Sequence, residues 1–185
     1  MQPFRDTVLS VDVSSSRPEI LGGSVDGTVR VFDVRGGAVT TDELGAPVVC
    51  ARFSGDGALV LAACADGAVR CADRRTGEVL GAYTGHASGG TKTDCAWTAQ
   101  DAFLCCGGED GRVTYWDVMG GGDGTDGAGG GGAGGGGAGA PVKAFRAHDL
   151  AVTALDVRRD GAAVVTAGAD GAAWAWTVDG EPVGG

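Results

Sequence analysis

The chain has 185 residues, of which 43% are apolar and 21% charged, so it is long enough for one domain and too apolar for disorder over most of its length. Its formal net charge is −10 and only Lys92 and Lys143 are lysines, which argues against direct binding to bare nucleic acid or an acidic membrane. Without an N-terminal leader or an apolar stretch of roughly 18 residues, we expect a cytoplasmic and nuclear protein that does not enter membranes.

The first predicted element is a tight turn followed by a strand, "SVDGTVRVFDV" at residues 24–34. Nearly the same pattern returns as "CADGAVRCADR" from Cys64, "GEDGRVTYWDV" from Gly108 and "GADGAAWAWTV" from Gly168. The turn carboxylates are separated by steps of 40, 44 and 60 residues, and they are Asp26, Asp66, Asp110 and Asp170. This self-similarity predicts a repeat architecture.

The second and fourth copies consist of short apolar runs separated by Asp-Gly turns, which favour β-hairpins, and helical periodicity is missing. The predicted strands span residues 48–53, 58–64, 68–73 and 78–84 in the second copy, and 151–157, 162–168 and 172–178 in the fourth. A unit of about 40 residues with four antiparallel strands is typical of a propeller blade, which must stack on its neighbours to bury both faces. We therefore predict an all-β fold of blades with four antiparallel strands.

The irregular third step contains a Gly-rich insertion, residues 118–141, which we interpret as a disordered, mobile linker between the third and fourth strands of the third blade. The three blades before it cover about 1–42, 43–84 and 85–117, and residues 142–185 hold the last strand of the third blade and the fourth blade. A formal Gly-x-Gly-x-x-Gly at Gly122, Gly124 and Gly127 is not followed by a helix, so it does not predict dinucleotide binding. We expect no cofactor.

Six cysteines lie in or beside strand-like runs without Cys-x-x-Cys spacing. Such cysteines behave as small buried hydrophobic residues, which fits a reducing compartment. The alternative is a disulfide between Cys64 and Cys71 on neighbouring strands.

These residues resemble the WD-repeat family, whose signature is a Gly-His before the first strand and a Trp-Asp closing the third. The third copy has Gly85-His86 and Trp116-Asp117. The fourth has Ala147-His148 and Trp176-Thr177, the first has Phe32-Asp33, and the second ends Ala72-Asp73 without the aromatic residue.

The resemblance implies a structural hydrogen-bond relay that links the His, a Ser or Thr, the turn Asp and the Trp of each blade. The fourth blade supplies His148, Thr166, Asp170 and Trp176. The third supplies His86, Asp110 and Trp116, with Cys106 where the hydroxyl belongs, whereas the first two blades keep only Asp26 and Asp66. We expect a structural role for both histidines rather than metal binding or general-base catalysis, and we expect no enzyme.

Within the family, "EILGGSVDGTVRVFDVR", "TGEVLGAYTGH", "TDCAW" and "EDGRVTYWDV" resemble the scaffolds that organise mitogen-activated protein kinase cascades. This resemblance implies a seven-bladed propeller that binds kinase-cascade or spliceosome components, with the four copies forming its C-terminal portion. Because only "TVDGEPVGG" follows Trp176, we expect an open arc of four blades, the last with three strands. The alternatives are a substrate-recognition adaptor, as in a ubiquitin ligase, and a propeller enzyme.

Overall fold

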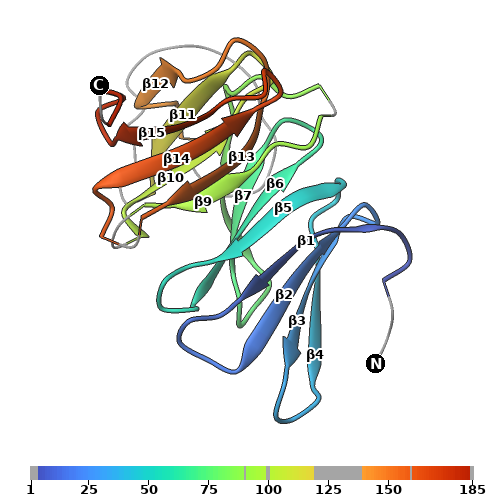
Figure 1. Cartoon of the computed structure of the whole chain (residues 1–185). Helices are drawn as coiled ribbons and strands as arrows, with labels where there is room; N and C mark the ends of the chain where they lie inside the picture. The colour runs from blue at the N-terminus through green and yellow to red at the C-terminus, as the bar shows by residue number, and fades with distance from the viewer. Residues whose placement is uncertain (1–3, 90, 99–100, 119–138, 159, 184–185) are drawn as a thin grey trace, which may run out of the picture.

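The computed structural model describes residues 4–89, 91–98, 101–118, 139–158 and 160–183. Within these ranges the chain forms four antiparallel sheets and no α-helix, which confirms the predicted all-β architecture. No helix in this described part could cross a membrane. In Figure 1 the first sheet lies at the bottom, the second lies above it, and the third and fourth sheets overlap at the top.

Each strand pairs with the next strand of its own repeat. The first sheet contains β1 (Val8–Val13), β2 (Glu19–Ser24), β3 (Thr28–Asp33) and β4 (Val39–Glu43). The second contains β5 (Val48–Phe53), β6 (Leu59–Cys64), β7 (Val69–Asp73) and β8 (Val79–Tyr83). The third contains β9 (Cys95–Trp97), β10 (Phe103–Gly107), β11 (Arg112–Asp117) and β12 (Lys143–Arg146). The fourth has three strands, as expected: β13 (Val152–Val157), β14 (Ala163–Gly168) and β15 (Ala173–Thr177).

The Asp-Gly turns connect neighbouring strands in every sheet. Gly27 and Gly67 both have φ of +82°, a left-handed conformation that glycine adopts without steric cost. In these turns the Asp carboxylate accepts a hydrogen bond from the amide two residues later, as Asp26 does from Thr28 (3.0 Å) and Asp66 from Ala68 (3.2 Å). The carboxylate and the glycine together explain why the dipeptide recurs.

The sheets pack face to face, and we call the face that contacts the preceding sheet the leading face and the opposite one the trailing face. The leading face of the second sheet packs on Leu21, Val29 and Val31 of the first, and its members are Val48, Ala51, Phe53, Val60, Ala62 and Cys64. Equivalent clusters join the second sheet to the third around Leu61 and Trp116, and the third to the fourth around Val113 and Val152. The core is therefore a series of junctions between sheets.

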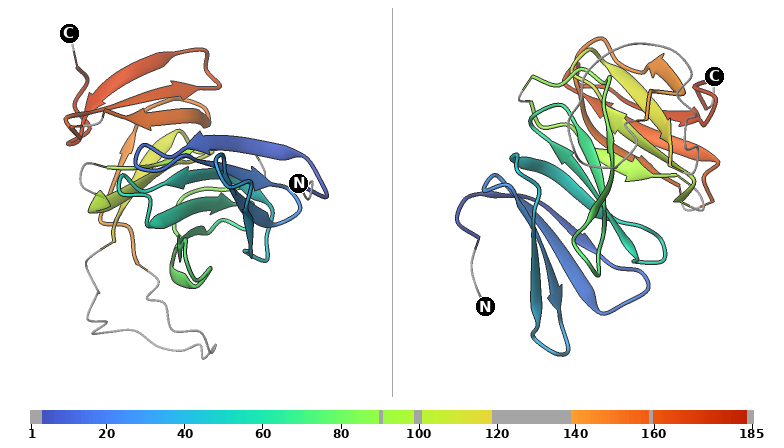
Figure 2. Two further views of the ribbon diagram at one scale, coloured as in Figure 1. Left: turned by 90° about the horizontal axis from the view of Figure 1, so that it is seen from below. Right: turned by 180° about the vertical axis from the view of Figure 1, so that it is seen from behind.

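The arrangement is an open arc, as the sequence predicts. In the described part of the chain, the substantial contacts between sheets join consecutive sheets only. Figure 2 shows the first and fourth sheets at the two ends of the arc, with the trace between β11 and β12 drawn in grey. Most of the predicted insertion, residues 119–138, lies outside the described residues.

All six cysteines are free and buried, so the alternative of a Cys64–Cys71 disulfide is wrong. Cys64 packs toward the first sheet, whereas Cys71 packs toward the third. The two thiols project from opposite faces of one sheet, where they cannot bond.

Candidate functional site

In the fourth sheet the structure joins all four residues of the expected relay. His148, in the loop before β13, lies 3.0 Å through Nδ1 from both carboxylate oxygens of Asp170. Its Nε2 lies 2.8 Å from Oγ1 of Thr166 on β14, which also accepts a 2.9 Å hydrogen bond from Nε1 of Trp176 on β15. Because the Asp170 carboxylate can only accept, Nδ1 of the neutral His148 ring carries the proton, and Nε2 accepts from the Thr166 hydroxyl.

These hydrogen bonds join the loop before β13, the Asp170-Gly171 turn, β14 and β15 within the fourth sheet. The amides of Ala172 and Asp149 also donate to Asp170, at 3.0 and 3.1 Å. The Ala172 amide contributes most to lowering the pKa of Asp170, partial desolvation opposes it, and the bonds from Asp149 and His148 add to it. The Asp170 carboxylate is therefore held ionised in its turn.

Thr166, His148 and Asp170 have the order of a hydrolase triad, but their environment does not suit catalysis. Thr166 is only 1% exposed, and the His148 side chain is fully buried. The Thr166 oxygen already accepts a hydrogen bond from Trp176. A nucleophile needs access to its substrate, so this arrangement acts as a structural brace.

The third sheet corrects the expectation that His86, Asp110 and Trp116 form a second relay. Trp116 donates through Nε1 to the carbonyl oxygen of Thr84 (3.0 Å), and its ring meets His86 edge-on with centroids 5.6 Å apart. Nδ1 of His86 is buried without a hydrogen-bond partner. The link fails because Cys106 occupies the hydroxyl position and its thiol bonds to the carbonyl of Gly107 (3.4 Å).

Burial of His86 lowers the pKa of its imidazole, and the negative charge of Asp110 offsets only part of that effect. Asp110 itself accepts a hydrogen bond from the Arg112 amide (3.2 Å) and lies 3.6 Å from the guanidinium of that residue. It therefore stabilises its own turn.

Asp26 and Asp66, in the first two sheets, serve their turns in different ways. Asp66 forms a two-point ion pair with Arg70, at 3.0 and 2.6 Å, which lowers the pKa of the carboxyl. Burial acts to raise the pKa of Asp26, but hydrogen bonds from Thr28, Arg5 and Ser24 lower it overall. Neither sheet needs a histidine to keep its turn carboxylate bonded.

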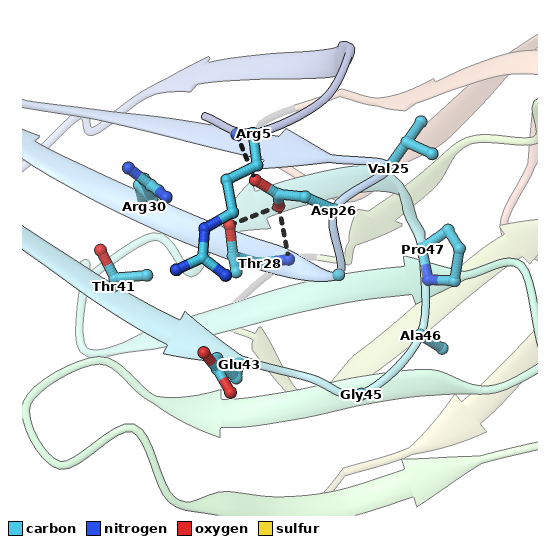
Figure 3. Close-up of a pocket in the computed structure, with 11 residues that line it drawn as sticks. Arg5, Val25, Asp26, Thr28, Arg30, Thr41, Glu43, Gly45, Ala46 and Pro47 are labelled. Atoms are coloured by element: carbon cyan, nitrogen blue, oxygen red, sulfur yellow. Dashed lines mark hydrogen bonds between the residues drawn. The ribbon is translucent and has the colours of Figure 1, made fainter. Parts of the chain in front are cut away.

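Asp26 also lines a polar pocket of about 500 Å³ at one end of the first sheet, which we call the rim pocket. Figure 3 shows Asp26 accepting hydrogen bonds from the Arg5 amide (2.8 Å) and from the Thr28 hydroxyl (2.6 Å). Arg5 and Glu43 are exposed, so both charges are available to a partner, while Thr28 and Arg30 form the buried wall. The lining residues are Arg5, Val25, Asp26, Gly27, Thr28, Arg30, Thr41, Glu43, Gly45, Ala46 and Pro47.

Of the tryptophans in the described part of the chain, Trp174 is the most exposed, at 52%. Trp97 is buried, and Arg30 lies against the ring of Phe4, 4.8 Å from its centroid. Arg70 is engaged by Asp66. Tryptophan is a common interface anchor, so Trp174 marks a second exposed candidate.

Ion pairs across the junctions between sheets were not predicted from the sequence. Arg52 of the second sheet bonds to Asp94 beside the third, with nitrogen and oxygen 3.0 Å apart. Arg74 of the second sheet pairs with the buried Glu19 of the first. The partners are 42 and 55 residues apart in sequence, and no local pattern links them.

No group of three or more His, Cys, Asp or Glu side chains within the described ranges is arranged to hold a metal ion. The formal Gly-x-Gly-x-x-Gly lies outside those ranges.

Comparison with known proteins agrees with the repeat architecture. The model of the family described as "WD domain, G-beta repeat" matches residues 3–33, 40–73, 77–117 and 139–177. The "WD repeat domain-containing protein 83" of Rattus norvegicus is 44% identical over 117 residues, covering 63% of this chain and 36% of that protein. Its Dictyostelium discoideum homolog is 29% identical over 103 residues, covering 56% and 32%. The chain thus spans about a third of the length of these curated relatives.

Among solved structures, the computationally designed Ika4 protein superposes with a TM-score of 0.72 over 96% of this chain and 95% of that one. The two sequences are 21% identical, so this likeness concerns the fold alone.

Proposed function

The chain belongs to the WD-repeat family, and from this premise we propose that it is a non-catalytic scaffold on which other proteins assemble. The observation that carries the proposal is the rim pocket, where the exposed charges of Arg5, before β1, and Glu43, at the end of β4, lie at one end of the first sheet. Rigid sheets that hold loops in fixed positions are suited to docking. His148 and Thr166 of the relay, by contrast, are buried and hydrogen-bonded within the fold.

We propose that the bound proteins are components of mitogen-activated protein kinase cascades, of pre-mRNA splicing complexes, or of both, in the cytoplasm and nucleus. The support is the similarity of the repeat sequences to the scaffolds that organise such kinase cascades. The chain spans about a third of the length of the curated relatives that it matches. The fold alone does not select these partners, because one fold carries many functions.

The test is affinity purification of the tagged chain from cells, with its partners identified by mass spectrometry. We expect kinases of the cascade or splicing factors, with the tagged chain in both cytoplasm and nucleus. Recovery of ubiquitin-ligase subunits without either group would reject the scaffold and favour the substrate-recognition adaptor.

A pair of charge-neutral variants tests the rim pocket in the same experiment. The double variant Arg5→Glu with Glu43→Lys reverses both exposed charges and should lower partner recovery severalfold. The control is Arg35→Glu with Glu78→Lys, which exchanges the same charges in the exposed turns at the opposite end of the first two sheets. Equal recovery by the two double variants would show that partners dock elsewhere, and Trp174→Ala would then be the next variant.

A further inference from the structure

The three junctions between sheets can be compared at one pair of positions. On the earlier sheet this is the residue that pairs with the last residue of the third strand, and on the later sheet it is the residue that follows the third strand. At the first junction these residues are Glu19 and Arg74, which form the ion pair described above. At the second they are Leu59 and Val118, and both pack against the apolar cluster of that junction. The first two junctions are therefore filled at these positions.

The third junction has Phe103 and Val178 at the same positions, and it stays open there. The two side chains are 40 and 39% exposed. They line a pocket of about 430 Å³ between the third and fourth sheets, which we call the junction pocket, together with Tyr115, Val142, Lys143 and Asp179. The junction pocket thus takes the place of the side-chain contacts that fill the first two junctions.

Apolar groups form most of the walls of the junction pocket. Besides Phe103 and Val178, they include Val142, which is 58% exposed, and the buried ring of Tyr115. That ring stacks on Phe145, with centroids 6.3 Å apart, so it is held in place from behind. Walls of aromatic and branched aliphatic side chains favour an apolar ligand.

The charged groups that line the junction pocket are Lys143 and Asp179. Nζ of Lys143 donates to the carbonyl oxygen of Val178 (3.1 Å) and lies 3.4 Å from a carboxylate oxygen of Asp179. The Asp179 side chain is 83% exposed, and an ion pair so open to water contributes little to stability. The Asp179 carboxylate can therefore accept a further donor from a ligand.

We propose that the junction pocket binds an aromatic side chain of a partner protein, with a neighbouring Lys or Arg of that protein paired to Asp179. The occupant is a protein segment, because free small ligands lose about 70–90% of their surface in a pocket and these walls are too open for that. Residues that flank an anchor side chain can cover such an open rim. The basic neighbour follows from the exposed carboxylate and the net charge of −10.

A short peptide tests the junction pocket directly, because the proposal takes from the scaffold function only that the occupant is a protein. The probe is N-acetyl-para-fluorophenylalanyl-arginine amide, added to the full chain and followed by fluorine NMR. We expect its fluorine signal to shift and broaden. Val178→Lys, which places a cation among the apolar walls, should abolish the change. Leu80→Lys, at a 45% exposed position of β8 outside the pocket, should leave it intact.

A second probe tests the carboxylate. N-acetyl-para-fluorophenylalanyl-alanine amide keeps the ring but lacks the cation. Asp179→Asn should weaken the binding of the arginine probe severalfold and leave the binding of the alanine probe unchanged, because only the first forms the ion pair. Equal weakening with both probes would overturn the role of Asp179.

The same variants distinguish this site from the rim pocket in affinity purification from cells. Val178→Lys should lose at least one partner that Leu80→Lys retains. Retention of every partner, or probe signals that stay unchanged up to the solubility limit of the peptide, would overturn the proposal. A chain that binds the probe but recovers no partner would support the junction pocket and reject the scaffold function.

Discussion

Thr166 is the residue on which the brace of the fourth sheet depends, because its hydroxyl serves His148 and Trp176 together. We expect Thr166→Val to lower the free energy of unfolding by about 1–3 kcal/mol, since it removes the partner of the buried Nε2 of His148 and of the half-buried Nε1 of Trp176. Urea unfolding followed by tryptophan fluorescence would measure the loss. Thr166→Ser, which keeps the hydroxyl, should lose clearly less, and equal losses would contradict the role assigned to the hydroxyl.

His86 should make the protein less stable in mildly acidic solution. Its pKa is 6.5 in the unfolded chain and lower in the folded one, where burial disfavours the charged ring. Above pH 6.5 both states are neutral, whereas below it the unfolded chain binds a proton that the folded chain binds only at lower pH. The stability is therefore present above pH 6.5 and is lost as pH falls from 6.5 through the folded pKa.

The measurement is the free energy of unfolding in urea between about pH 5 and about pH 7.5, a range in which histidine titrates. His86→Gln should remove part of the decrease that the wild type shows toward acid. An identical slope in the two proteins would mean that His86 is protonated as readily in the folded chain as in the unfolded one.

At the scale of elements, the close approach of sheets decides which substitutions a strand accepts. A Cβ on Gly107, at the end of β10, would lie 2.7 Å from Cβ of Val152 on β13. We expect Gly107→Ala to destabilise the protein by about 1–3 kcal/mol, because the third and fourth sheets would have to separate. The readout is the thermal unfolding midpoint.

Gly36→Ala is the matched control, because a Cβ there would meet only the carboxylate at the end of the half-buried Asp33 side chain, at 3.2 Å. Its effect should stay within about 0.5 kcal/mol. Equal thermal unfolding midpoints for the two alanine variants would mean that the third and fourth sheets separate at little cost in free energy.

At the scale of the whole molecule, salt should weaken the binding of partners at the rim pocket. The pocket offers the exposed charges of Arg5 and Glu43, whose attraction to a partner is screened by salt. We expect washing at higher salt to reduce partner recovery, which mass spectrometry of the retained proteins measures. Recovery that does not change with salt would indicate an apolar interface.

The repeat can be predicted from the sequence because the residues that form each turn and strand lie close together in the chain. A turn needs its Asp and Gly within four residues, and a strand's alternation appears within six, so the four sheets, the open arc and the three-stranded last sheet could be predicted. The structure brings the four residues His148, Thr166, Asp170 and Trp176 together in the fourth sheet, and each stands at a fixed offset within one repeat. Cys106 was noted in the third repeat, but its consequence, an unpartnered Nδ1 on His86, appeared only in the structure.

The sequence by itself determined where each strand begins, where it turns and which side chains share a face, because these depend on neighbours a few residues away. Only the tertiary structure decided which faces are covered, since burial is settled by sheets about 40 residues apart. For that reason Val165 and Leu21 look alike in the repeat, yet one is half exposed and the other fully buried. The pairs Arg52–Asp94 and Arg74–Glu19 belong to the same class, because each forms only after two sheets have met.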